Sequence, residues 1–157
     1  MKIRALKFLP VFGFIAVAAA FSSVSAQTVA GSIGNGTVTR GKAARATVVL
    51  SIPGGLHVNS YRPDSEYSVP TSVRATSGNA KIGPVSYPRG RNRKFSFSES
   101  TINVYEGRTS FGFNVTVPAG FRGDRISVRV VVRYQACTDE VCYSPKSKEI
   151  TLTARVL

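Results

Sequence analysis

Hydrophobic residues alternate with polar or small ones along three long segments of the chain. In residues 108–117, Phe111, Phe113 and Val115 share one face, and polar residues or glycine stand between them. The same alternation recurs in residues 126–134 and 150–156. A period of two is that of a β-strand with one buried face. The sequence therefore predicts three amphipathic strands in the second half of the chain.

Shorter runs rich in β-branched residues predict further strands. Turn signals separate them, among them Pro53-Gly54-Gly55, Glu106-Gly107 and Pro118-Ala119-Gly120. No segment has the period of a long amphipathic helix. About seven to nine short strands with such turns predict an all-β fold, an antiparallel immunoglobulin-like sandwich of two sheets. The shorter candidate strands are residues 46–52, 56–59, 71–75, 81–87 and 102–105.

The N-terminus has the composition of a secretory signal peptide. Lys2, Arg4 and Lys7 precede an apolar run over residues 8–21, and small residues occupy 24–26. The run is short for a membrane anchor, which needs about 20 apolar residues. We expect cleavage after Ala26, which leaves residues 27–157 as one secreted, soluble, periplasmic domain without a membrane span.

The chain is strongly basic, with a formal charge of +13, and about +10 remains after the three positive charges of the leader are subtracted. A basic balance suits nucleic acid, anionic lipid or an acidic partner. Export makes nucleic acid an unsuitable partner. The densest basic stretch, residues 89–94, is interpreted as a solvated loop, with a docking surface as the alternative.

The two cysteines, Cys137 and Cys142, are separated by four residues and follow a predicted strand. An even count in an oxidising compartment favours a disulfide, and a reverse turn brings such residues within bonding range. A bridge over so short a loop adds little stability, about 2 kcal/mol in the loop-entropy model. Spacing alone leaves open whether the pair is a structural staple or exchanges with a partner's thiols.

Residues 134–145, Tyr-Gln-Ala-Cys-Thr-Asp-Glu-Val-Cys-Tyr-Ser-Pro, resemble the active-site segment of the N-terminal periplasmic domain of the thiol:disulfide interchange protein DsbD. Residues 55–60 with Pro63 and residues 69–71 resemble an earlier block of that family. The chain departs from the pattern in having one residue fewer between the cysteines and Ser144-Pro145 where the family has Pro-Pro. It also stops at Leu157, so we expect a stand-alone domain that lacks the membrane helices and thioredoxin-like domain of DsbD.

The resemblance implies an immunoglobulin-like fold and a redox role for Cys137 and Cys142. The pair would take electrons from a thioredoxin-like periplasmic or membrane-bound protein and pass them to an oxidised periplasmic protein, as a component of a protein-disulfide reductase. The family covers its cysteines with a mobile aromatic cap loop, and the matching residues here are 94–100. Phe97 is the first cap candidate and Phe95 the second; alternatively, both are core residues of a strand.

His57 is the chain's one histidine. One histidine and two cysteines without C-x2-C spacing make a poor zinc or copper site, so we expect no metal and no cofactor. We expect His57 to be a hydrogen-bonded strand residue near the cysteines. No Ser/His/Asp arrangement for hydrolysis is evident. Two classes of function remain: a thiol:disulfide exchange module, and a non-catalytic immunoglobulin-like binding or accessory domain with a structural hairpin disulfide.

Overall fold

The computed structural model describes residues 27–157 except 64–67 and 97. The expected signal peptide, residues 1–26, lies outside the described residues. All regular elements of the described part are β-strands, which form three four-stranded sheets. This part of the chain contains no helix with the length and apolarity that a membrane span requires.

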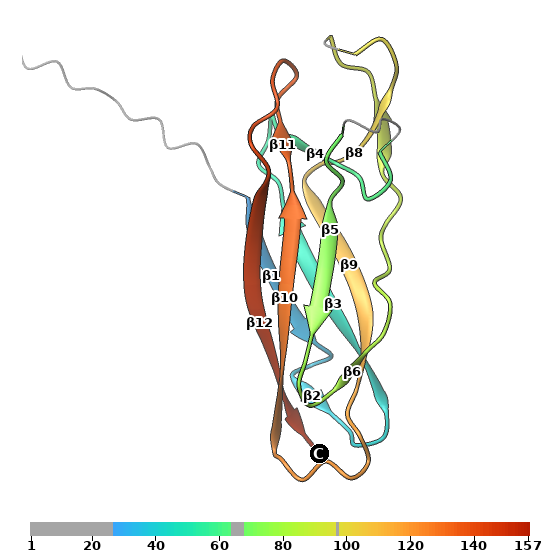
Figure 1. Ribbon diagram of the computed structural model, residues 1–157, viewed down its shortest axis with the longest axis vertical. Helices are drawn as coiled ribbons and strands as arrows, with labels where there is room; N and C mark the ends of the chain where they lie inside the picture. Colours follow the sequence, from blue (N-terminus) through green and yellow to red (C-terminus); the bar gives the residue numbers. More distant parts are fainter. Residues whose placement is uncertain (1–26, 64–67, 97) are drawn as a thin grey trace, which may run out of the picture.

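Two of the sheets pack face to face along the long axis of the molecule (Figure 1). Sheet A has the order β1-β3-β9-β6, all antiparallel, and sheet B has the order β2-β12-β10-β5, in which only the β2–β12 pair is parallel. In sheet A the strands are β1 (Thr28–Ile33), β3 (Ala43–Ser51), β6 (Lys81–Ile82) and β9 (Arg108–Thr116); in sheet B they are β2 (Thr37–Val38), β5 (Ser72–Thr76), β10 (Arg125–Tyr134) and β12 (Lys146–Val156).

The core lies between these sheets and is built from the alternating positions. Phe111 and Phe113 of β9 and Val128 and Val130 of β10 are at most 1% exposed. Removing such side chains from water contributes about 1.5–3 kcal/mol each. The predicted all-β immunoglobulin-like sandwich is therefore confirmed, and so are its three long strands.

A third sheet caps the end of the sandwich opposite the C-terminus (Figure 1). Sheet C has the order β11-β4-β8-β7, all antiparallel. Its strands are β4 (His57–Asn59), β7 (Arg91–Arg93), β8 (Ile102–Tyr105) and β11 (Ala136–Cys137). The expectation of two sheets was thus incomplete, because these strands are too short to carry a readable alternation.

Sheet C is held to the core by its inner face. Val58 of β4 and Tyr105 of β8 are paired and belong to the core cluster. The Tyr105 hydroxyl donates a hydrogen bond to the Pro88 carbonyl oxygen (3.0 Å), and its ring packs edge-on against Phe111 with 5.8 Å between centroids. At the turn between β8 and β9, Gly107 adopts φ +61°, a left-handed conformation that favours glycine. Packing of these residues on the core therefore fixes the position of sheet C relative to the sandwich.

Two predictions about short segments were wrong. Residues 81–87 were expected to form one strand, but only Lys81–Ile82 do so, with an isolated bridge from Ser86 to Gly112. Residues 89–94 were interpreted as a loop, but Arg91–Arg93 form the exposed edge strand β7. Charged residues on an edge strand are common because they discourage pairing with another chain. Strands β1, β2 and β11 were not predicted.

Candidate redox site

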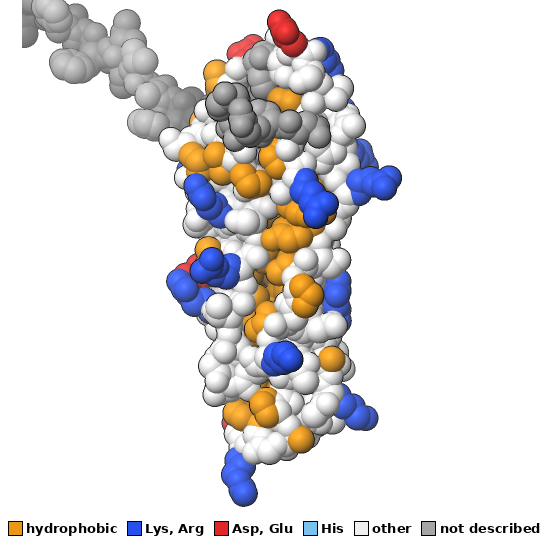
Figure 2. Space-filling view, turned by 45° about the vertical axis from the view of Figure 1, so that its right-hand side comes forward, with side chains coloured by type: hydrophobic (Ala, Val, Ile, Leu, Met, Phe, Trp, Pro, Cys, Tyr) orange, Lys and Arg blue, Asp and Glu red, His pale blue; other side chains and the backbone are white. Residues whose placement is uncertain are grey.

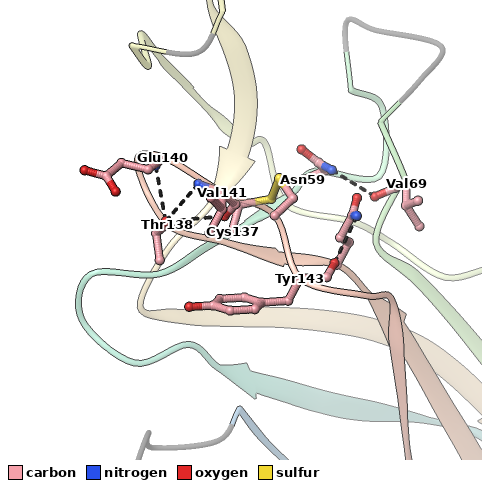
Figure 3. Close-up of a disulfide and its surroundings, with 9 residues drawn as sticks. Asn59, Val69, Cys137, Thr138, Glu140, Val141 and Tyr143 are labelled. Atoms are coloured by element: carbon pink, nitrogen blue, oxygen red, sulfur yellow. Dashed lines mark hydrogen bonds between the residues drawn. A yellow bond between two sulfur atoms is a disulfide. The ribbon is translucent and has the colours of Figure 1, made fainter.

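Cys137 and Cys142 form a disulfide in a hairpin at the end of sheet C. The bond is 2.02 Å long and the two Cα atoms are 4.0 Å apart. The disulfide hairpin, residues 136–143, is closed by backbone hydrogen bonds from Tyr143 N to Ala136 O and from Thr138 N to Val141 O, both 2.8 Å. The Thr138 hydroxyl accepts hydrogen bonds from the backbone N–H groups of Glu140 (3.2 Å) and Val141 (3.0 Å) (Figure 3). The turn is therefore held by its own hydrogen bonds as well as by the sulfur bridge.

The two cysteines differ in their access to solvent. Cys137 lies in β11 and is 1% exposed, whereas Cys142 lies on the returning arm and is exposed. Both border a cavity of about 190 Å³, whose walls include His57, Asn59 and Gln135. Neither cysteine belongs to the hydrophobic core between the sheets. A partner protein therefore meets one exposed and one buried cysteine residue.

The strand register places His57 beside the disulfide. Cys137 pairs with Cys142 on one side and with His57 of β4 on the other. Residues directly opposite in antiparallel strands project from the same face, so these three side chains form a row. Asn59 is two residues further along β4, on the same face, and Figure 3 shows it next to the disulfide.

His57 is almost completely buried, with 2% of its surface exposed. Its ring stacks on Phe95 with 4.1 Å between centroids and 18° between planes. Burial lowers the pKa of His57 below its ordinary value of 6.5; Asp139 and Glu106 oppose that shift by their negative charges, and Arg93 adds to it. The imidazole is therefore neutral at neutral pH.

Phe95 belongs to the segment in which the sequence predicts a cap. It is buried, with 4% of its surface exposed, lies outside any strand and is not part of the cluster between sheets A and B. Ser96 links the same segment to the disulfide hairpin, since its hydroxyl donates a hydrogen bond to the Asp139 carbonyl oxygen (3.1 Å). The first cap candidate, Phe97, lies outside the described residues.

Basic and acidic side chains both lie around the site. Figure 2 shows Lys and Arg side chains along the length of the face in view. Arg91 and Arg93 of β7 are exposed, and Arg93 forms an ion pair with Glu106 (3.4 Å). The hairpin itself carries exposed Asp139 and Glu140. The surroundings of the cysteines are thus mixed in charge.

The structure brings together residues that are distant in sequence. Of the site residues expected from the sequence, Cys137, Cys142, His57 and Phe95 lie together. Asn59, Gln135 and Ile102 also line the cavity and were not singled out as site residues. Gln135 and Asn59 are two residues from Cys137 and His57 respectively, so the period of two would have identified them once those strands were known.

Fold and site together define a class of protein: a small immunoglobulin-like β-sandwich with a half-exposed disulfide in a short hairpin at one end. The family model described as "Thiol:disulfide interchange protein DsbD, N-terminal" matches residues 35–154. The chain belongs to this family.

Two of the proteins that are similar to the chain show how far the similarity extends. The thiol:disulfide interchange protein DsbD of Actinobacillus pleuropneumoniae serotype 5b (strain L20) is 24% identical over 97 residues, which cover 62% of this chain and 15% of that protein. The solved N-terminal periplasmic domain of ScsB from Proteus mirabilis superposes with a TM-score of 0.56 at 11% identity, covering 85% of this chain and 49% of the other. At that identity the second match supports the fold alone.

Proposed function

We propose that this chain is a periplasmic thiol:disulfide exchange module. A thioredoxin-like donor would reduce the Cys137–Cys142 disulfide, and the resulting dithiol would reduce an oxidised protein. The observation that carries the proposal is the unequal exposure of the two cysteine residues in a hairpin outside the core. Membership of the DsbD N-terminal family supports it.

Cys142, the exposed cysteine, would be the point of exchange. A partner thiolate attacks Cys142 Sγ, a mixed disulfide forms, and the electron pair of the broken S–S bond goes to Cys137 Sγ. The partner's second thiolate then attacks the partner's first sulfur in the mixed disulfide. The partner's disulfide forms, and Cys142 leaves as a thiolate. Two electrons and two protons have then moved from the partner dithiol to the domain. The reverse sequence delivers them to an oxidised protein.

Phe95, and with it Phe97, would form the cap over the pair. Phe95 stacks on His57, which lines the cavity, and there it would limit the approach of small reagents. A partner that displaces this segment would gain access to the disulfide. Secretion belongs to the same proposal: residues 1–26 would direct export and be removed, leaving Gln27 as the first residue.

Thioredoxin with its reductase and NADPH tests the proposal, because NADPH is consumed as the disulfide is reduced. We expect rapid, stoichiometric reduction of the native domain. Of the single-cysteine variants, Cys137→Ala whose Cys142 has first been converted to a mixed disulfide with thionitrobenzoate should exchange with a thioredoxin that lacks its second cysteine, forming a protein–protein mixed disulfide and releasing thionitrobenzoate. Cys142→Ala treated in the same way should not. A disulfide that thioredoxin reduces only after the domain is unfolded would instead support the accessory domain with a structural staple.

A further inference from the structure

In the proposed exchange cycle the buried cysteine has to be deprotonated, and the inference that follows rests on that proposed function. Cys137 is 1% exposed, and it must lose a proton each time the dithiol closes to a disulfide. The thiolate, not the thiol, is the nucleophile. A thiol with so little contact with water has few water molecules to take its proton. A proton acceptor on the protein would remove that barrier.

His57 has the position that such an acceptor needs. It is directly opposite Cys137 in the antiparallel β4–β11 pair, on the same face, and both side chains line the same cavity. Directly opposed residues have Cβ atoms about 4.5–5.5 Å apart. The Phe95 ring covers one side of the imidazole and the strand fixes its backbone, so the ring has little freedom to turn away.

The charged groups around His57 support transient protonation. Asp139, on the disulfide hairpin, and Glu106, which follows β8, both stabilise an imidazolium through their negative charges. Arg93, on β7, opposes them, but it is itself paired with Glu106. A neutral imidazole is an acceptor, and two nearby carboxylates favour the cation that it becomes.

We propose that His57 accepts the proton of the Cys137 thiol when the reduced pair closes, and that in the reverse reaction it donates a proton to the Cys137 thiolate as the disulfide opens. In the closing step the proton moves from Cys137 Sγ to an imidazole nitrogen of His57. The thiolate attacks Cys142 Sγ in the mixed disulfide, a new S–S bond forms, and the partner sulfur leaves with the electron pair of the broken bond. The imidazolium then releases its proton to the leaving thiolate or to water.

This assignment has a distinctive dependence on pH. The Cys137 thiol with a neutral His57 carries the same number of protons as the Cys137 thiolate with a protonated His57. Between the pKa of the imidazole and that of the thiol, the fraction of molecules in the reactive thiolate–imidazolium form therefore does not change with pH. The closing rate should therefore be level around neutral pH. An unassisted thiol would give a rate that rises about tenfold per pH unit below its pKa of about 8.5 or higher.

The closing step can be isolated with 5,5′-dithiobis(2-nitrobenzoate) and the reduced domain. Cys142 attacks the reagent and releases one thionitrobenzoate; Cys137 then expels the second in an intramolecular phase whose rate is independent of reagent concentration. In the wild type we expect the second phase to vary less than about twofold between about pH 7 and 8. In His57→Gln it should slow by about tenfold or more at pH 7 and regain the steep profile, while the first phase stays within about twofold.

Thr71→Val is the matched control. The Thr71 hydroxyl donates a buried hydrogen bond to the Asn59 carbonyl oxygen of β4 (2.6 Å). Thr71 does not line the cavity. It disturbs the same strand without touching an acid or base, so the level profile should persist. A wild-type second phase that rises tenfold per pH unit would overturn the proposal even if His57→Gln did not fold, and so would an unchanged second phase in His57→Gln. The reagent replaces the protein partner, so failure of thioredoxin to reduce the domain is a separate result that refutes the proposed function alone.

Discussion

Reducing the disulfide should leave the domain folded and only modestly less stable. The bridge joins residues five apart in sequence and lies outside the hydrophobic core. The hairpin keeps its own backbone hydrogen bonds and the contacts of the Thr138 hydroxyl without the S–S bond. We therefore expect the bridge to constrain the turn of the hairpin and to contribute little to the stability of the sandwich.

The expected magnitude follows from the loop that the bridge closes. For a loop of about six residues, the loop-entropy relation gives about 7 cal/mol/K, which is about 2 kcal/mol at room temperature. For a domain of this size, such a loss corresponds to a fall in Tm of about 6–10 °C. The urea slope should stay nearly constant, because the surface exposed on unfolding barely changes.

Urea unfolding of oxidised and reduced protein, followed by circular dichroism with and without a phosphine reductant, measures this difference. The variant Cys137→Ala/Cys142→Ser should match the reduced protein; alanine at 137 avoids leaving a hydroxyl in a buried position. A loss above about 4 kcal/mol, or a reduced protein that is unfolded without urea, would refute the reasoning. The disulfide would then be a structural staple.

Three further outcomes are expected. Phe95→Ala should speed reduction of the disulfide by dithiothreitol, because it uncovers His57 beside the cavity, and should cost less than the roughly 3–5 kcal/mol of a core Phe→Ala; a loss within that range, with an unchanged reduction rate, would assign Phe95 to packing alone. Because burial lowers the pKa of His57, its contribution to stability is fully present above about pH 6.5 and declines as pH falls below that value, where the unfolded state binds the extra proton. The urea midpoint should therefore fall less between about pH 7 and 5 in His57→Gln than in the wild type. An equal fall in both proteins would contradict this role of His57. Intact-mass analysis of exported protein should give a chain that begins at Gln27; a mature form that retains residues 1–26 would remove the argument for a periplasmic compartment.

The alternating patterns were sufficient to predict the sandwich. Strands β9, β10 and β12 each bury one face over many residues, so their period of two is visible without any tertiary information. β8 was predicted with the same ends, Ile102 and Tyr105. The cysteine segment pointed to the family because residue types at fixed spacing are a local property of the chain.

The chemistry of the site was decided by the tertiary structure. Sheet C consists of strands of two to four residues, so neither its existence nor the pairing of Cys137 with His57 is encoded in a local period. Sequence supplied two cysteines and one histidine 80 positions from the nearer of them. Only the register of β4 against β11, fixed by the burial of Val58 and Tyr105 in the core, places His57 opposite the buried Cys137, while Cys142 is exposed. Long-range strand pairing depends on which faces the whole core buries, and this is why no local pattern specifies it.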